Sequence, residues 1–335
     1  MAEPKFLVVR LGSLGDIVHA FPAVAALKKT FPNGRIVWLT HSRWRELVAS
    51  AQIAHEIWEV ETRSFVSVRE ICSKIRAEKF STSIDYQGLW KSAALPFLSG
   101  VPRRIGFSSE SVREFGVPFL YSDRVHAQSA HVVDMNGELS ICAGAPKPTA
   151  DFSLAVSEEA KATVRSKLTS NEIENFVVLS PGGGWLSKCW PAERYGALAT
   201  RLRNELGVRC VVNYGPGEKA LAERVVAASG DAAPILYSGT FGELMALLQA
   251  ARCAIAGDTG PMHLADALGT RVVAIFGPTD PARNGPYLGR LAGTATVLRA
   301  EGVESTYKRA DEAHPSLLQI SVDQVFEAMC KLEAR

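Results

Sequence analysis

Two short segments far apart in the chain carry residue types that could do chemistry. Gly12-Ser13-Leu14-Gly15-Asp16 lies near the start, and Asp258-Thr259-Gly260-Pro261-Met262-His263 lies near the end. Each directly follows an apolar run typical of a buried strand and opens a helical pattern. In α/β proteins, helix-terminal amides and polar side chains gather around a ligand at such positions. The pattern therefore predicts two sheets that face one ligand-binding cleft.

Asp16 is the first candidate for acid–base chemistry. A carboxylate at the positive end of a helix is held ionised, which suits a general base if the cleft is dry and the substrate proton comes close. The same position is equally typical of a carboxylate that only stabilises the helix dipole. His19, one turn further along, is an alternative base, although a lone histidine there is more often a packed residue.

A third segment, residues 180–193, runs from an apolar strand pattern through three consecutive glycines to Lys188 and the start of a helix. Glycines let backbone amides approach a phosphate, and a lysine adds a positive charge. The segment is not a Walker A loop, since no Ser or Thr follows Lys188, and Ser187 stands where a dinucleotide fingerprint would have its third glycine. The alternative is a flexible connection with a solvated lysine.

Further polar residues follow strand patterns of the second half. Asp258 and Thr259 suit an anion-binding helix N-terminus, and equally an ordinary helix cap, while His263 alone is typical of a packed residue. Glu218 follows the strand pattern that ends near Asn213, where an acidic residue commonly accepts hydrogen bonds from a ribose or simply begins a helix. Because these segments all lie at the carboxyl ends of strands of one predicted sheet, together they indicate a nucleotide site.

Strand and helix patterns alternate through both halves, which predicts mostly parallel sheets. Residues 103–127 are less regular, and residues 280–314, rich in Gly, Pro and Arg, are predicted as surface loops. We predict strands at 6–9, 35–39, 56–60, 82–86, 176–179, 209–212, 235–237, 253–256 and 272–276. We predict helices at 16–29 (bent or divided at Pro22), 43–50, 66–79, 89–98, 131–143, 158–168, 191–206, 219–228, 243–251, 262–268 and 322–332.

Length and composition indicate a soluble α/β protein of two domains. A chain of 335 residues is comfortable for two domains, and Pro146-Lys147-Pro148-Thr149 interrupts the pattern as a linker would. With 47% hydrophobic and 21% charged residues and a net charge of +2, the chain shows no bias towards nucleic acid. The six cysteines lack CxxC spacing, and neither a signal peptide nor a membrane span is evident, so we expect a cytoplasmic protein with reduced thiols.

Taken together, the motifs resemble those of glycosyltransferase family 9, the lipopolysaccharide heptosyltransferases. The resemblance covers nearly the whole chain through residues 10–16, 103–107, 131–134, 182–191, 258–263 and 276–281. It implies a GT-B fold with two Rossmann-like domains, residues 1–150 for the acceptor and 151–318 for the nucleotide sugar. Residues 319–335 would form a helix that packs back towards the N-terminal domain. The resemblance also implies inverting, metal-independent transfer of a heptose from ADP-heptose to a lipopolysaccharide core sugar.

The resemblance also implies roles for individual residues. Asp16 would deprotonate the acceptor hydroxyl, and Lys188 would hold and stabilise the departing diphosphate, in place of a metal or other cofactor. Glu218 would bind the ribose. The residues expected at the donor are Gly183, Gly184, Ser187, Lys188, Glu218, Met245, Asp258, Thr259, Gly260 and His263, and those expected at the acceptor are Arg10, Ser13, Arg103, Arg104 and Arg113.

The expected partners are a nucleotide-sugar donor and an anionic glycolipid acceptor, without nucleic acid. An amphiphilic acceptor would bring the protein transiently to the cytoplasmic face of the inner membrane, through Phe65 and Val66 or through Phe115 and Phe119. The chain departs from the family in its three glycines, where a threonine pair is usual, and in residues 305–309, where some members carry cysteines. These departures leave the donor sugar and the acceptor open.

Two other functions fit the same architecture. A nucleotide-sugar epimerase would share the two domains, but it gives no reason for Gly15-Asp16 or for Lys188-x-Trp190-Pro191. A non-catalytic nucleotide-sugar binder would not need Asp16.

Overall fold

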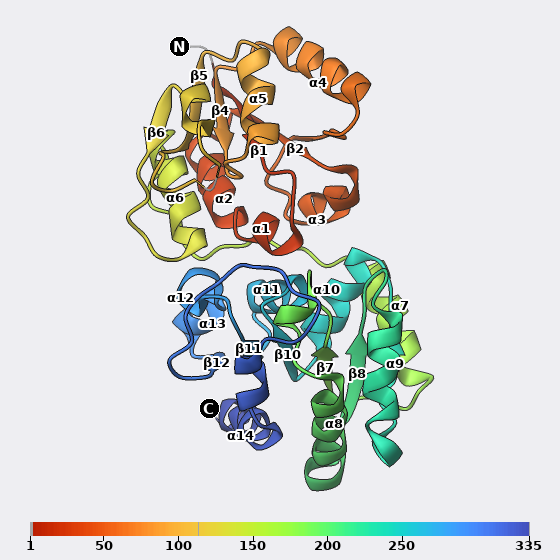
Figure 1. The fold of residues 1–335 in the computed structure, drawn as a ribbon. Helices are drawn as coiled ribbons and strands as arrows, with labels where there is room; N and C mark the ends of the chain where they lie inside the picture. Colours follow the sequence, from red (N-terminus) through yellow and green to blue (C-terminus); the bar gives the residue numbers. More distant parts are fainter. Residues whose placement is uncertain (1–2, 113, 335) are drawn as a thin grey trace. The chain divides into compact units, whose positions relative to one another are not determined.

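The computed structural model describes residues 3–112 and 114–334 of the chain. The chain forms two compact units, Met1–Ala155 and Val156–Arg335, and each is built on one parallel six-stranded sheet (Figure 1). The expected division after residue 150 falls in the same stretch without helix or strand that contains this boundary.

The first unit has the strand order β3-β2-β1-β4-β5-β6. Apolar runs such as Phe6–Val9, which is almost inaccessible to solvent, form its centre because a parallel sheet is covered on both faces. The strands are β1 (Lys5–Val9), β2 (Arg35–Thr40), β3 (Glu56–Glu59), β4 (Thr82–Asp85), β5 (Arg103–Phe107) and β6 (Asp123–Val125). The helices are α1 (Leu14–Val18), α2 (Phe21–Thr30), α3 (Arg45–Ser50), α4 (Phe65–Glu78), α5 (Trp90–Leu98) and α6 (Val132–Cys142), with 3-10 turns η1 (Ser42–Trp44) and η2 (Val117–Leu120).

The second unit repeats this topology in the order β12-β11-β10-β7-β8-β9. Its strands are β7 (Phe176–Ser180), β8 (Arg209–Asn213), β9 (Ile235–Tyr237), β10 (Cys253–Gly257), β11 (Val272–Phe276) and β12 (Ala295–Arg299). Its helices are α7 (Glu158–Thr169), α8 (Ala192–Leu206), α9 (Lys219–Ala227), α10 (Phe241–Ala250), α11 (Gly260–Ala267), α12 (Pro281–Asn284), α13 (Tyr287–Ala292) and α14 (Val322–Glu333). Three 3-10 turns accompany them, namely η3 (Leu186–Lys188), η4 (Gly230–Ala232) and η5 (Pro315–Gln319).

In both sheets the winding reverses next to the first strand of the unit, between β1 and β4 and between β7 and β10. Parallel pairing places the carboxyl ends of these neighbours side by side, with Val9 opposite Asp85 and Ala256 opposite Ser180. Ligands of open α/β sheets bind at such switch points, outside the carboxyl ends of the strands. The segments of residues 12–16 and 258–263 follow β1 and β10 and therefore lie at these positions.

The helix predicted over residues 16–29 is divided near Pro22, which was one of the two outcomes expected. α1 ends at Val18, and α2 begins at Phe21 with Pro22 in its first turn. Proline is tolerated there because the amides of a first helical turn have no intrahelical acceptor.

Residues 103–127, described from the sequence as less regular, contain β5 and β6, and the prediction of surface loops at residues 280–314 was wrong in part, since this stretch contains α12, α13 and β12. β6 and β12 are edge strands, and the side chains of β12 are only partly buried or exposed. An edge strand needs no continuous apolar run, so the signal that identified the central strands is absent from these segments.

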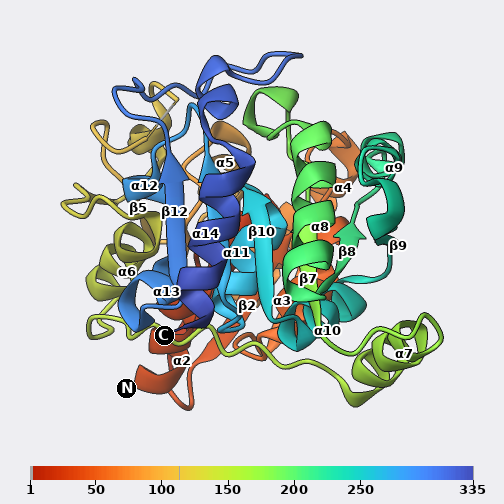
Figure 2. The ribbon, with the colours of Figure 1, turned by 90° about the horizontal axis from the view of Figure 1, so that it is seen from below.

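The final helix α14 packs on α8, β11 and β12 of the second unit (Figure 2). The indole nitrogen of Trp190, at the start of α8, donates a 3.0 Å hydrogen bond to the carbonyl of Ile320, just before α14. These contacts place α14 in the core of the second unit. The expectation that residues 319–335 pack back towards the N-terminal domain stays a prediction.

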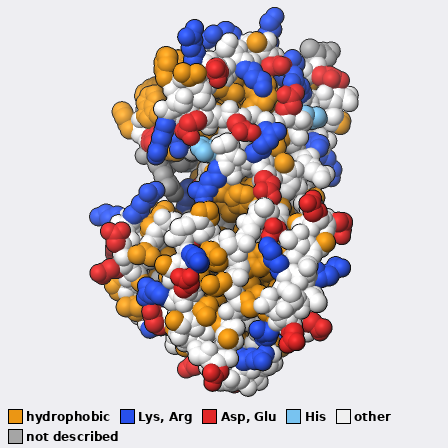
Figure 3. Space-filling view, turned by 90° about the vertical axis from the view of Figure 1, so that its right-hand side faces the viewer, with side chains coloured by type: hydrophobic (Ala, Val, Ile, Leu, Met, Phe, Trp, Pro, Cys, Tyr) orange, Lys and Arg blue, Asp and Glu red, His pale blue; other side chains and the backbone are white. Residues whose placement is uncertain are grey.

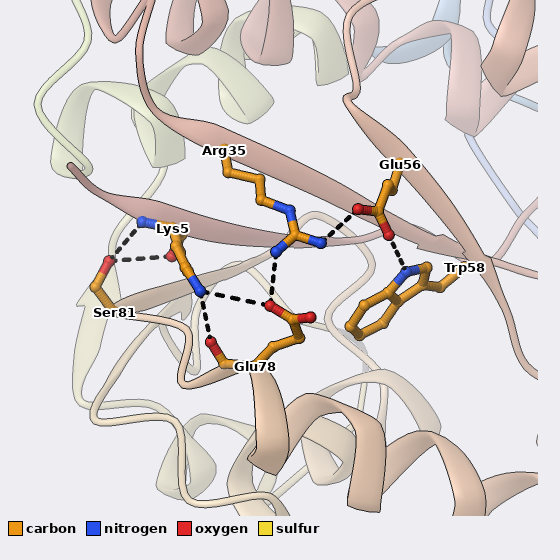
Figure 4. A network of polar contacts seen from close by, with 6 residues as sticks. All are labelled: Lys5, Arg35, Glu56, Trp58, Glu78 and Ser81. Atoms are coloured by element: carbon orange, nitrogen blue, oxygen red, sulfur yellow. Dashed lines mark hydrogen bonds and ion pairs between the residues drawn. The ribbon is translucent and has the colours of Figure 1, made fainter.

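An ion-pair network joins the amino ends of β1, β2 and β3 (Figure 4). Arg35 pairs with Glu56 and lies 2.6 Å from Glu78, and Glu56 also accepts a 2.9 Å hydrogen bond from the Trp58 indole. The hydrogen bond from Trp58, and then that from Arg35, lowers the pKa of Glu56. Because these groups are solvent-accessible, the network adds modestly to stability, at the sheet edge opposite Asp16.

On the face shown in Figure 3, Lys and Arg side chains are interspersed with Asp and Glu. Within residues 3–112 and 114–334, no helix is long and apolar enough to cross a membrane.

Candidate functional site

The glycine loop of the second unit follows β7 and ends in η3. A Cβ on Gly182 would lie 2.3 Å from the Glu218 carboxyl carbon, and one on Gly183 would lie 3.3 Å from Cγ2 of Thr259. By contrast, no described atom lies within 4 Å of a Cβ built on Gly184. The loop after β7 therefore packs against residues that follow β8 and β10, and only glycine fits at residue 182 without moving Glu218.

Lys188, at the end of this loop, forms a buried ion pair across the switch point. Its Nζ lies 2.5 Å from Oδ2 of Asp258 and 3.2 Å from the Asp258 carbonyl oxygen. The other carboxylate oxygen of Asp258 lies 3.2 Å from Nε2 of His263, one turn into α11. Lys188, Asp258 and His263 thus form one connected chain, in which the Lys188 and Asp258 side chains are 12% and 4% exposed.

The surroundings of Asp258 hold its side chain ionised. Burial alone would raise the pKa of this carboxyl, but the hydrogen bond from His263 and the charge of Lys188 outweigh burial and hold the pKa below its ordinary value. Asp258 therefore keeps a negative charge beside Lys188 at neutral pH.

Glu218, the expected ribose ligand, lies beside the glycine loop. Its carboxylate accepts a 2.8 Å hydrogen bond from the amide of Gly215, which fixes the side chain across from Gly182. A carboxylate at the end of the second strand of a Rossmann-like unit is placed as a ribose ligand would be.

Several hydroxyl groups around this edge have no hydrogen-bond partner within the described part of the chain. Thr259 is the N-cap residue of α11, as expected, but its side chain makes no capping hydrogen bond and its Oγ1 is buried without a partner. The same holds for Oγ of Ser180 and Ser187, Oγ1 of Thr279 and Nε1 of Trp185. Buried polar atoms normally have a hydrogen-bond partner, so such a cluster is typical of a site that binds water or a ligand.

The remaining donor-site candidates lie in the same unit. Gly260 is the first residue of α11, where the free amides of the first turn lie, and Met245 is buried within α10. The structure thus brings Lys188, Glu218, Asp258, Thr259 and the glycines together, while Met245 adds an apolar helix beside α11.

Sequence reasoning missed Trp185 and the segment that covers it. Trp185 lies in the glycine loop, and its ring contacts both Lys188 and Arg309. Residues 303–314, which we call the strap, are hydrogen-bonded to the loop, since the Ser187 amide donates to the Ala310 carbonyl at 3.2 Å. The sequence signals were the departure of residues 305–309 from the family pattern and the two neighbouring cations Lys308 and Arg309.

In the first unit, Asp16 lies at the switch point between β1 and β4, within α1. One carboxylate oxygen accepts hydrogen bonds from the amide and hydroxyl of Ser13, at 3.1 and 2.9 Å, and the other lies 2.7 Å from Nη2 of Arg10. The Asp16 side chain is 43% exposed, whereas that of Arg10 is 8% exposed. Arg10 and Ser13, both expected at the acceptor, thus hold the Asp16 carboxylate in place.

Gly12 and His19 complete this centre. A Cβ on Gly12 would lie 2.8 Å from the Trp44 indole nitrogen, so the loop before α1 needs glycine for a close approach. His19 is 5% exposed and packs edge-on against His131. Of the two candidate bases, Asp16 is therefore the accessible one.

Arg103 and Arg104, which were also expected at the acceptor, are not brought to Asp16. Arg103 and Arg104 begin β5, where Arg103 is in register with Thr82 and thus lies at the amino edge of the sheet. Arg103 pairs with Asp123 at 3.0 Å, and Arg104 donates to the Leu120 carbonyl at 2.8 Å. Both serve local structure, so their position lends no support to an acceptor role. Arg113 lies outside the described residues.

No group of three or more His, Cys, Asp or Glu side chains that could hold a metal ion occurs among the residues that the structure describes.

Comparisons with known proteins agree with this geometry. The family model described as "Glycosyltransferase family 9 (heptosyltransferase)" matches residues 68–310. The chain is similar to lipopolysaccharide heptosyltransferase 1 of Pseudomonas aeruginosa, with 26% identity over 300 residues that cover 84% of this chain and 81% of the relative.

Two solved structures share the fold. The family 9 glycosyltransferase of Veillonella parvula has a TM-score of 0.83 at 22% identity and covers 99% of this chain and 98% of its own. The E. coli heptosyltransferase WaaC with ADP has a TM-score of 0.78 at 23% identity and covers 98% and 99%. These likenesses establish the GT-B fold for the two Rossmann-like units.

Proposed function

The chain belongs to glycosyltransferase family 9, and on this premise we propose that it moves a heptose, or a related sugar, from an ADP-activated donor to a lipopolysaccharide inner-core sugar or a related acceptor. The observation that carries the proposal is the buried series of polar contacts that joins Lys188, Asp258 and His263 at the switch point of the second sheet. It lies beside a glycine loop and the first turn of α11. Lysine, glycine amides and a helix N-terminus are groups that bind a diphosphate.

The donor assignment draws on the arrangement around β7, β8 and β10. Lys188 and the amides of Gly183, Gly184 and Gly260 would hold the diphosphate, and Glu218 would bind the ribose. Ser187, Thr259 and His263 line the same edge, Met245 would contribute to the base pocket, and Asp258 would lie near the sugar. The structural relative WaaC is described with ADP, which favours adenine as the base.

Transfer with inversion follows from a direct displacement. The Asp16 carboxylate takes the proton of the acceptor hydroxyl while the acceptor oxygen attacks the anomeric carbon and the bond from that carbon to the diphosphate oxygen breaks. The leaving diphosphate gains negative charge, which Lys188 and the helix-terminal amides stabilise. In this scheme Lys188 does the work that a divalent cation does in other transferases, so we propose that the reaction needs neither metal nor another cofactor.

Asp16 is the proposed base because it is both accessible and held in place. Arg10 and Ser13 fix its two carboxylate oxygens, while 43% of the side chain stays open to a substrate. His19 is buried and is not proposed for this role.

We also propose that the first unit touches the surface of the inner membrane transiently, from its cytoplasmic face. The four apolar side chains expected there are well exposed, at 80% for Phe65, 63% for Val66, 94% for Phe115 and 70% for Phe119. The guanidinium of Arg124 lies 5.5 Å from the Phe119 ring, which places a cation next to this apolar pair. Aromatic and cationic groups together suit the interface of an anionic bilayer.

Of the alternatives, the epimerase is set aside by family membership. A non-catalytic paralogue would not need Asp16 to be held by Arg10 and Ser13.

Isothermal titration with ADP, UDP, GDP and dTDP in EDTA tests the donor site. We expect selective binding of ADP, weakened about ten- to a hundredfold in Lys188→Ala, since a charge-assisted contact is worth roughly 1.5–3 kcal/mol. Tighter binding of UDP or dTDP would be consistent with the assigned fold but would rule out ADP-heptose as the donor. If no nucleotide bound, the proposed phosphate site would be wrong.

A further inference from the structure

The strap, residues 303–314, is held against the donor loop by backbone hydrogen bonds on both sides. The Ser187 amide donates to the Ala310 carbonyl at 3.2 Å, and the His314 amide donates to the Ser187 carbonyl at 3.4 Å. Nearer the start of the strap, the Thr306 amide donates to the Pro278 carbonyl at 2.8 Å. The strap is therefore a fixed part of the edge formed by the loops after β7 and β11.

Trp185 carries two cations on its ring. The ammonium of Lys188 lies 4.6 Å from the ring centroid, and the guanidinium of Arg309, from the strap, lies 4.9 Å from it. A cation gains from the face of an indole, but two cations on one ring repel each other. An anion that contacts both cations would relieve this repulsion.

The charges of the loop are unequally balanced. Lys188 already forms an ion pair with Asp258, and Asp258 stays ionised. Arg309 is exposed, and its guanidinium forms no ion pair with any described carboxylate. An arriving anion would therefore meet Lys188, whose charge Asp258 partly balances, and Arg309, whose charge no described carboxylate balances in an ion pair.

We propose that Arg309 binds the diphosphate of the donor, with its guanidinium held against the Trp185 ring that Lys188 also contacts. The inference rests on the proposed nucleotide-sugar donor and adds a strap residue to that site. Arginine suits this role because its planar guanidinium can donate two parallel hydrogen bonds to a phosphate and also stack on an aromatic ring. Arg309 of the strap thereby adds a positive charge to that of Lys188, which Asp258 partly balances.

Binding of ADP and adenosine to the full chain tests this role, because adenosine lacks the diphosphate. We compare the ratio of the two dissociation constants in the wild type, Arg309→Ala and Arg309→Met. Methionine keeps an apolar stem that packs on the indole but carries no charge. Loss of one phosphate contact is expected to weaken ADP binding about tenfold in both variants and to leave adenosine binding unchanged.

Lys308→Ala is the matched control. Lys308 is the neighbouring exposed cation, and its hydrogen bond to Thr306 Oγ1 comes from the backbone amide, which the substitution keeps. An unchanged ADP-to-adenosine ratio in Arg309→Met, or an equal fall in Lys308→Ala, would overturn the role of Arg309 and leave the nucleotide site standing. Equal weakening of both ligands would show that Arg309 acts only through packing and would also overturn it. A wild type that binds no ADP would overturn the proposed donor as well.

Discussion

The contact between Lys188 and Asp258 joins two residues that follow different strands, and both side chains are largely buried. Removing one partner of a buried pair leaves the other charge without compensation, which costs more than the pair itself contributes. Asp258 therefore has two functions. It holds Lys188 in position, and it compensates the positive charge of the Lys188 ammonium in a buried site.

We predict that Asp258→Asn lowers the free energy of unfolding by roughly 3 kcal/mol at pH 7, as measured by urea denaturation. The pKa of Asp258 is lower in the folded protein than its ordinary value. Its contribution is therefore fully present above an unfolded pKa of about 4 and is lost as the pH falls towards the folded pKa. The difference between wild type and variant should stay constant from pH 7 to 5 and narrow below about pH 4.

Glu158→Gln is the matched control for this prediction. Glu158 pairs with Lys161 on the surface, and 85% of its side chain is exposed. Its removal should leave the urea denaturation curve nearly unchanged, because an exposed ion pair is screened by solvent. If Asp258→Asn were as mild as Glu158→Gln, the buried pair would not have the importance assigned to it.

At the scale of elements, packing within the chain requires glycine at residue 182 of the loop after β7 but not at residue 184. A Cβ on Gly182 would lie 2.3 Å from the Glu218 carboxyl, whereas a Cβ on Gly184 would meet no described atom within 4 Å. Because Glu218 ends in a flexible carboxyl, Gly182→Ala should displace that group and break its hydrogen bond to the Gly215 amide.

We therefore predict that Gly182→Ala weakens ADP binding about ten- to a hundredfold with little change in Tm. The expected factor follows from one lost hydrogen bond to a charged group, roughly 1.5–3 kcal/mol. Titration calorimetry measures the affinities. An affinity of Gly182→Ala equal to that of the wild type would mean that Glu218 does not contact the nucleotide.

α14 is the element that closes the core of the second unit. Met329 is fully buried in the cluster that α14 shares with α8 and the sheet, whereas Glu327 lies on the exposed face of the same helix. Met329→Ala should lower the free energy of unfolding by about 2–5 kcal/mol because it leaves a cavity, and Glu327→Ala by less than about 0.5 kcal/mol. Denaturation curves decide this, and a mild Met329→Ala would contradict the assigned packing.

The elements that the sequence predicted correctly are those with continuous apolar runs, such as β1, β7 and β11, and helices with a buried stripe, such as α8. β6 and β12 were missed because edge strands are only partly buried. Within the site, the loops could be placed at strand ends from the pattern alone. The pairing of Lys188 with Asp258 and the contact of Arg309 with Trp185 join residues far apart in sequence, which no local pattern encodes.

For the whole molecule, the two units share one strand order, and each brings its chemistry to the switch point of its sheet. This much followed from strand and helix alternation, since parallel βα units wind in few ways. The burial of Arg10 beside Asp16 could not be predicted from the sequence, because an arginine directly after a strand is usually expected to face solvent.

Contact with a membrane also belongs to this scale. We predict that a double variant, Phe115→Ser with Phe119→Ser, binds vesicles containing an anionic phospholipid at least fivefold more weakly than the wild type, because two exposed aromatic side chains leave the interface. Cosedimentation measures the bound fraction. Leu291→Ser is the control, since Leu291 is 61% exposed on α13 of the second unit. An equal loss in the control would disprove this surface.

Transfer itself gives the most direct test of the proposed enzyme. Purified protein is incubated in EDTA with ADP-heptose and a lipopolysaccharide acceptor whose core lacks heptose, and the glycosylated product and released ADP are quantified by mass spectrometry. We predict equal amounts of both for the wild type, and at least a hundredfold slower transfer for Asp16→Asn, since general-base catalysis contributes about 10²–10⁴-fold. Unchanged transfer by Asp16→Asn, or no transfer by the wild type until a divalent metal is restored, would contradict the account.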